Sequence, residues 1–161
     1  MLFRSRFAEA AVRAGVDGVL LVDLPPEEAD ETRAIFNRHG LALIMLASPT
    51  TSDERLAMLC DEAQGYLYYV SFAGVTGASE RLDTRAAGDR LRRIRAQARA
   101  PVAAGFGIRD AVSARAMAVD ADGVVVGSAL VSELARTDAP DTPPVRAAAF
   151  LAPLRQALDQ P

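Results

Sequence analysis

Five apolar runs recur along the chain, and polar residues do not alternate with apolar ones inside them. The runs occupy residues 17–24, 41–48, 65–71, 101–106 and 122–128. Continuous apolar runs of this length are typical of strands that are buried on both faces, as the strands of a parallel sheet are. The pattern therefore predicts five strands that run in the same direction.

A helix signal follows each apolar run. Pro26 and the two glutamates after it predict the first turn of a helix that Gly40 ends. Thr51 and Glu54 have the spacing of a capping box at the start of the next helix. The residues expected on the buried faces of the following two helices are Leu91, Ile94, Ala98, Val112, Ala116 and Val119. Further helices are expected at about 6–14, over 128–135 and after Pro144.

Repeated strand–helix units with short connections predict a parallel α/β sheet with right-handed crossovers. Two architectures fit, and the length of 161 residues favours a five-stranded doubly wound sheet, since a complete (β/α)8 TIM barrel needs about 250 residues. The glycines near the ends of the last two apolar runs, at residues 105–107 and 127, favour the barrel, because barrels often hold phosphate in the loops after strands seven and eight. If the last apolar run is strand eight of a barrel, the five runs are strands 4–8 of an incomplete barrel. Residues 1–161 are expected to form a single domain.

Composition limits the chemistry that the chain can perform. Every basic residue is an arginine, so Schiff-base catalysis by a lysine is excluded. A formal net charge of −3 gives no general attraction to nucleic acid or to anionic membranes. His39 and Cys60 are the only soft metal ligands, so we expect no metal site. His39, just before Gly40, suits a helix end better than a catalytic dyad, and Cys60 suits the core.

The single cysteine cannot form an intramolecular disulfide, which fits a reducing compartment. The basic N-terminal stretch lacks the apolar region of a signal peptide, and no apolar stretch approaches the length of a membrane span. We therefore expect a cytoplasmic protein.

Two strand-to-helix junctions share an unusual arrangement of glycines. "AAGFGIRD" (103–110) and "VVVGSALV" (124–131) each place glycine between an apolar run and a helical pattern. Glycine lets a ligand approach the backbone amides closely, and amides at such turns bind anions. We interpret the pair as a phosphate site, and tight turning without a ligand is the structural alternative.

The connection after the third run is longer than the others. About sixteen residues precede the next helix, a length that is uncommon unless the loop is functional. Gly74 and Gly77 supply hinges around Thr76. The segment is either a lid over a site or a tolerated surface insertion.

Four segments together resemble the alpha chain of tryptophan synthase, in order and spacing. They are "AGVDGVLLVDLPPEE" (14–28), "GYLYYVS…GVTGA" (65–78), "PVAAGFGI" (101–108) and "ADGVVVGSALV" (121–131). The resemblance implies a barrel lyase that cleaves indole-3-glycerol phosphate to indole and glyceraldehyde 3-phosphate. It also implies an alpha2beta2 tetramer in which indole passes to the beta chain. The pyridoxal phosphate cofactor belongs to that beta chain, and none is expected here.

The resemblance assigns roles to individual residues. The positions that match phosphate-binding ones are Gly77, Phe106, Gly107, Gly127 and Ser128. Tyr68 matches a tyrosine beside the indole, although a strand tyrosine can equally be core. Thr76 matches a threonine of the closing loop.

Part of the family's surface for the beta chain matches Asp23, Pro25 and Pro26, and Asp23 is also a secondary candidate for a catalytic carboxylate. Phe72 and Ala73 depart from the polar residues that the family often has in the closing loop.

The family's proton-transferring glutamate and its indole-binding aspartate belong to the second strand and its loop, which this sequence does not contain. We therefore expect residues 1–161 alone to be inactive and to self-associate through open sheet edges. The alternatives are a non-catalytic phosphate-binding half-barrel module and another phosphate-handling barrel enzyme, such as an isomerase.

Overall fold

A computed structural model describes residues 2–70, 84–105, 107–138 and 140–160. Its strands form one parallel sheet in the order β1-β2-β3-β4-β5, the same as their order along the chain. They are β1 (Gly18–Leu20), β2 (Ala42–Ala47), β3 (Leu67–Val70), β4 (Val102–Gly105) and β5 (Gly123–Val124). A doubly wound sheet reverses its strand order at a switch point, whereas a barrel does not. The sequential order shows part of a (β/α)8 barrel, and the doubly wound alternative is wrong.

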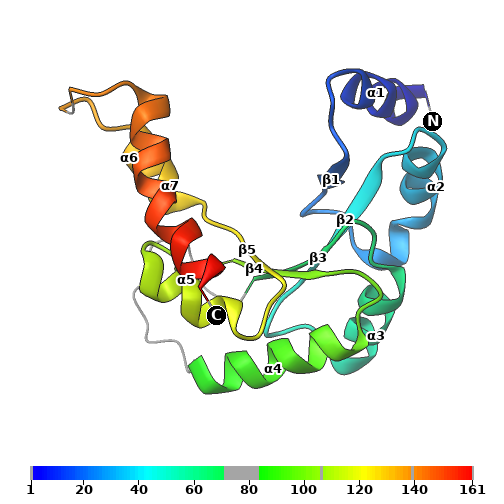
Figure 1. Cartoon of the computed structure of the whole chain (residues 1–161). Helices are drawn as coiled ribbons and strands as arrows, with labels where there is room; N and C mark the ends of the chain where they lie inside the picture. Colours follow the sequence, from blue (N-terminus) through cyan, green and yellow to red (C-terminus); the bar gives the residue numbers. More distant parts are fainter. Residues whose placement is uncertain (1, 71–83, 106, 139, 161) are drawn as a thin grey trace.

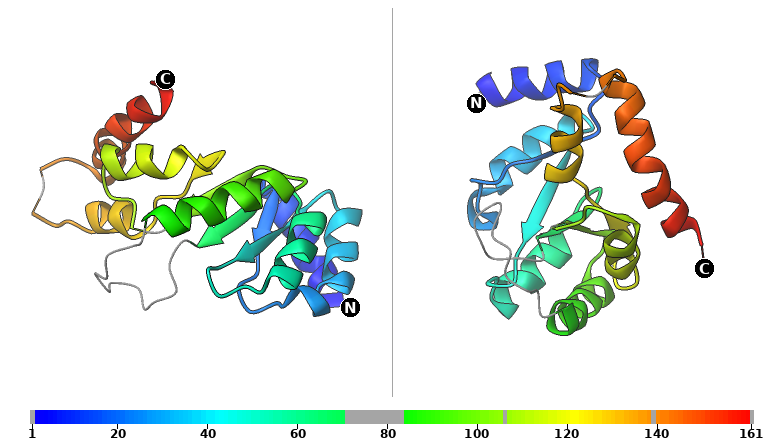
Figure 2. Two further views of the ribbon diagram at one scale, coloured as in Figure 1. Left: turned by 90° about the horizontal axis from the view of Figure 1, so that it is seen from below. Right: turned by 90° about the vertical axis from the view of Figure 1, so that its left-hand side faces the viewer.

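Helices lie along the outer side of a curved sheet, as Figure 1 shows. They are α1 (Leu2–Arg13), α2 (Asp30–Arg38), α3 (Asp53–Glu62), α4 (Thr84–Gln97), α5 (Ala111–Ala118), α6 (Ser128–Leu134) and α7 (Pro143–Asp159), with a 3-10 turn at Pro26–Glu28. In the described part of the chain no helix covers the middle of the inner face. Helix α1 and the pair α6 and α7 lie at opposite ends of the arc (Figures 1 and 2).

The strands lie where the apolar runs predicted them, but those at the edges are short. Residues 17–24 yield only the three-residue β1, after which Leu21 and Val22 leave the ladder. Each edge strand has a partner on one side only, so fewer backbone hydrogen bonds hold it extended.

Of the two predicted helix ends, one is confirmed and one is wrong. Gly40 follows α2 with φ +73°, and His39 caps that helix while its Nε2 contacts the Ser5 hydroxyl at 3.1 Å. The capping box at Thr51 and Glu54 is wrong, because Ser52 is the N-cap of α3 and accepts from the Arg55 amide at 3.3 Å.

The expected buried face is correct for α4 and wrong for α5. Leu91 and Ile94 are fully buried, and Ala98 packs against the same core. In α5 the side chains of Val112 and Val119 are 79% and 69% exposed, and Ala116 is exposed too. Helix α5 buries Ala114 instead, and Ala114 belongs to a small cluster with Leu154 of α7. Packing against α7 has set the rotation of α5, which its own sequence does not reveal.

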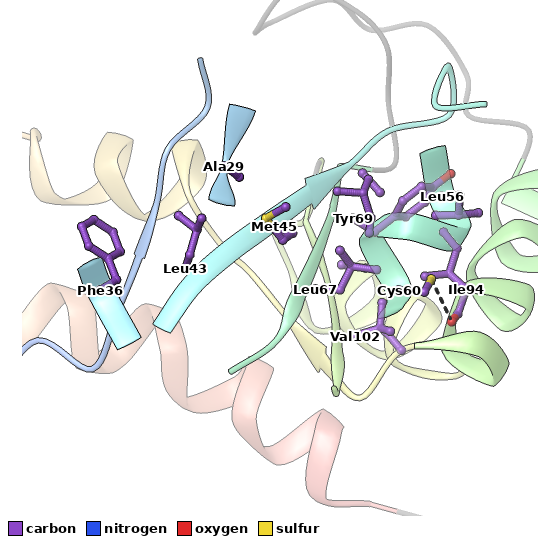
Figure 3. Packing of buried hydrophobic residues seen from close by; sticks show 14 of the residues in the cluster. Ala29, Phe36, Leu43, Met45, Leu56, Cys60, Leu67, Tyr69, Ile94 and Val102 are labelled. Atoms are coloured by element: carbon purple, nitrogen blue, oxygen red, sulfur yellow. Dashed lines mark hydrogen bonds between the residues drawn. The ribbon is translucent and has the colours of Figure 1, made fainter. Parts of the chain in front are cut away.

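The main core fills the space between the sheet and the helices outside it. Strand side chains pointing outward meet Phe36 of α2, Leu56 and Cys60 of α3, and Ile94 of α4 (Figure 3). The strand residues of this core are Leu43, Met45, Ala47, Leu67, Tyr69, Val102 and Ala104. The core position of Cys60 is confirmed, and burial raises the pKa of its thiol.

Candidate functional site

The strand register decides which side chains face the interior of the arc. Tyr68 pairs with Ala103 of β4, and Ala103 pairs with Gly123 of β5. Alternate residues of a strand point to opposite faces. Tyr69 lies in the core, so Tyr68 lies on the inner face, where it is half-buried. An inward-facing tyrosine fits both interpretations of Tyr68, as a neighbour of the substrate and as a part of the packed interior of a barrel.

Gly105 makes room for the Tyr68 ring. A Cβ built on Gly105 would overlap the phenol oxygen and lie 2.8 Å from Cε2. Burial raises the pKa of Tyr68, and the neighbouring Tyr66 adds to the effect, so the hydroxyl stays protonated at neutral pH. Gly105, the first glycine of "AAGFGIRD", therefore leaves space for the Tyr68 side chain, a role that the sequence pattern did not reveal.

Gly107 and Gly127 follow neighbouring strands, β4 and β5. The register pairs Ala104 with Val124, and each glycine comes three residues later along the chain, beyond the end of its strand. Gly107 has φ +67°, a conformation that favours glycine, and a Cβ on either glycine would meet no heavy atom of the described residues within 4 Å. Both turns therefore leave open space beside the backbone.

The two helices after these turns begin differently. Asp110 caps α5 by accepting from the Ser113 amide at 2.7 Å, and the Ser113 hydroxyl accepts from the Asp110 amide at 3.2 Å. The Ser113 amide and hydroxyl lower the pKa of Asp110, so its carboxylate is charged at neutral pH. The α5 end is thus occupied by the protein's own carboxylate, contrary to the expectation that both helix ends would face an anion.

Helix α6 begins at Gly127 and Ser128 without a side-chain cap or an acidic residue in its first turn. The Gly127 carbonyl accepts from the Val131 amide at 3.1 Å, which closes the first helical turn. Ser128 adds an exposed hydroxyl at the same turn. Of the two junctions, this one fits an anion better.

Asp23, Pro25 and Pro26 lie at the other edge of the sheet, after β1. Together with residues of β2 and α3 they line a pocket of about 440 Å³. Glu27 accepts from Arg55 of α3 at 2.9 and 2.6 Å, a bidentate ion pair that fixes this loop and lowers the pKa of Glu27. The structure does not bring Asp23 together with Gly107 and Ser128, and sequence reasoning missed Arg55.

The predictions for Thr76, Gly77 and Phe106, and most of the long loop, fall outside the described residues. Within the described ranges, no three His, Cys, Asp or Glu side chains are grouped as a metal site would need. In the same ranges every helix is too short or too polar to cross a membrane.

A family model of the tryptophan synthase alpha chain matches residues 2–158. The tryptophan synthase alpha chain of Xanthomonas oryzae pv. oryzae (strain MAFF 311018) is 77% identical over 155 residues, which are 96% of this chain and 58% of that protein. The chain thus spans less than two thirds of the length of the curated relatives it matches.

Solved structures of the same family have the same fold. Tryptophan synthase subunit alpha from Legionella pneumophila str. Paris has a TM-score of 0.84 and 42% identity over 97% of this chain and 57% of that chain. A chain of the tryptophan synthase complex from Pyrococcus furiosus has a TM-score of 0.79 and 32% identity over 95% of this chain and 60% of that chain. With the family model matching nearly all of its residues, the chain belongs to the tryptophan synthase alpha chain family.

Proposed function

We propose that this chain supplies the phosphate-binding part of a lyase that cleaves indole-3-glycerol phosphate to indole and glyceraldehyde 3-phosphate. The observation that carries the proposal is the pair of open turns at Gly107 and Gly127, on neighbouring strands of a member of this family. A dianion between these turns would accept hydrogen bonds from their amides and from the Ser128 hydroxyl. Phe106 and Gly77 belong to the same proposed site.

The indole part of the substrate is assigned to the inner face beside Tyr68. The Tyr68 ring lies on that face in the space that is open because Gly105 has no side chain. Thr76, in the loop that follows β3, is proposed to close over the bound substrate. These residues bind and orient the substrate and exclude water from it.

Proton transfer needs carboxylates that, by the family resemblance, are not among residues 1–161. General acid–base catalysis contributes about 10²–10⁴-fold to a rate. We therefore expect residues 1–161 to bind the phosphate of the substrate without cleaving it. Asp23, exposed at the far edge of the sheet, is retained only as a secondary catalytic candidate.

A two-step experiment tests the proposal. First, calorimetry should detect binding of glycerol 3-phosphate to residues 1–161. Second, indole should be released from indole-3-glycerol phosphate only after the N-terminal segment of a relative's alpha chain is added. Absence of phosphate binding contradicts the site. Binding without indole release after the addition favours a non-catalytic binding module.

The proposed partner is a tryptophan synthase beta chain, bound through Asp23, Pro25 and Pro26, and the proposed compartment is the cytoplasm. Titration with a relative's beta chain tests the contact. Residues 1–161 alone are also proposed to self-associate through the edge strands β1 and β5, and the exposed Leu21 and Val22 directly after β1 add apolar surface at that edge. Sedimentation measures that state, and a stable monomer would contradict it.

A further inference from the structure

Arg146 of α7 is a buried arginine bonded to backbone carbonyls. Arg146 is only 7% exposed to solvent. Nε donates to the Glu133 carbonyl at 3.1 Å, and Nη2 donates to the Leu134 and Arg136 carbonyls at 2.9 and 3.1 Å. Nη1 donates to the Asp141 carbonyl. Two carbonyls of the last turn of α6 and two of the connection to α7 thus converge on one guanidinium.

Within the described residues the hydrogen-bond acceptors of Arg146 are all carbonyls at or beyond the end of α6. The nearest carboxylate influence comes from Asp138, whose pKa is lowered first by its hydrogen bond with Arg136 and to a small extent by the charge of Arg146. A buried charge is costly unless hydrogen bonds compensate it. The carbonyls at the end of a helix carry partial negative charge, so they suit a guanidinium. The connection is arranged around this one side chain.

Helix α6 packs on α7, the helix that carries Arg146. It spans seven residues, none of them buried, and its last turn contains no basic residue of its own. A helix this short is unstable in isolation. Arg146 bonds to the carbonyl of its last residue, Leu134, and to that of Glu133. Arg146 therefore joins the last turn of α6 to α7 by hydrogen bonds, in addition to the packing between the two helices.

We propose that Arg146 is a positioning residue that, through α6, sets the place of the Gly127–Ser128 turn opposite Gly107. The inference rests on the proposed function, because it assumes that this turn binds the substrate phosphate. At about 1.5 Å per residue, α6 transmits a tilt at its C-terminal end to the turn about 10 Å away. Displacements of about 1 Å are sufficient to weaken a preorganised site.

The test compares Arg146→Met with the wild-type chain of residues 1–161. Titration with glycerol 3-phosphate should move the amide NMR signals of both Gly107 and Gly127 in the wild type. In Arg146→Met we expect the dissociation constant to rise about tenfold, equivalent to losing about one charge-assisted hydrogen bond. The Gly127 signal should lose its response while the Gly107 signal keeps part of its own. A general loss of stability would not separate the two glycines.

Two further variants keep the result interpretable. Arg146→Lys retains the charge but reaches fewer carbonyls, so its affinity should lie between the other two, and it replaces Arg146→Met if that variant does not fold. Ile35→Ala removes a fully buried side chain of α2, at the other end of the arc from α6 and α7, so it should lower stability but not affinity.

Unchanged affinity in Arg146→Met or Arg146→Lys overturns the positioning role while leaving the proposed function intact. An equal loss in Ile35→Ala overturns it as well, since instability alone would then explain the effect. A wild-type chain that binds no glycerol 3-phosphate contradicts the proposed function itself.

Discussion

The junctions β4–α5 and β5–α6 are alike in sequence and different in what occupies the start of each helix. Both place a glycine after a strand, and a Cβ on Gly107 or Gly127 would meet open space. At α5 the Asp110 carboxylate accepts from the Ser113 amide, whereas no side chain caps α6. The glycine alone thus does not define an anion site, because the residue at the N-cap decides whether amides are left for a ligand.

Gly127→Asp removes the difference between the two helix starts most directly, because it gives α6 the kind of N-cap that α5 already has. The new carboxylate would take the amides that the phosphate needs and would repel the dianion. Losing two charge-assisted bonds weakens binding of glycerol 3-phosphate by at least about a hundredfold. Calorimetry on Gly127→Asp measures the loss.

Gly127→Asn is the matched control, because it caps the helix without a charge. It should weaken binding less than Gly127→Asp. If Gly127→Asp binds glycerol 3-phosphate as the wild type does, the ligand does not lie at α6.

Gly107→Ala examines the other turn. With φ +67° and open space around its Cβ, it matches Gly40, which has φ +73° and the same open surroundings. Each alanine should cost about 1–2 kcal/mol of folding free energy, because a left-handed conformation disfavours any Cβ. Only the methyl at 107 lies in the space proposed for phosphate.

Urea unfolding of Gly107→Ala and Gly40→Ala should therefore give similar losses of stability, while calorimetry shows weaker phosphate binding for Gly107→Ala alone. Equal affinities in the two variants would mean that Gly107 serves only its turn.

The sequence predicted the framework of these junctions well, and their caps and packing poorly. Continuous apolar runs require burial on both faces, so five parallel strands followed directly from them. The sequence of α5 could not predict which of its faces is buried, because Ala114 packs against Leu154 of α7. Leu154 lies forty residues further along the chain than Ala114. Arg146 escaped notice for a similar reason, because its acceptors converge only once α6 and α7 pack together.

The glycines inside the two strands provide a smaller test. Gly105 and Gly123 both lie on the inner face, but a Cβ on Gly105 would overlap Tyr68, whereas on Gly123 its nearest neighbour would be 3.9 Å away. Gly105→Ala should destabilise the fold by about 1–3 kcal/mol through overpacking. Gly123→Ala should be close to neutral. Urea unfolding compares them, and equal stabilities would show that Tyr68 moves aside freely.

The smallest expected effect is the pH dependence of the folding stability that Asp110, the N-cap of α5, contributes. Hydrogen bonds from Ser113, first from its amide and then from its hydroxyl, lower the pKa of Asp110 below its ordinary 3.8. A carboxyl whose pKa is lower in the folded state stabilises the fold above its unfolded pKa. That stabilisation is lost as the pH falls through the folded pKa.

Asp110→Asn keeps an N-cap acceptor but does not titrate, so it isolates this contribution. The difference in Tm between wild type and Asp110→Asn should be constant from neutral pH down to about pH 4, near the pKa of a free aspartate. It should then shrink as Asp110 takes up its proton, while the other carboxyl groups cancel between the two proteins. A difference that stays constant down to the lowest pH at which both proteins remain folded would show that the charge of Asp110 does not stabilise the α5 end. The distinction between the two junctions would then rest on hydrogen-bond geometry alone.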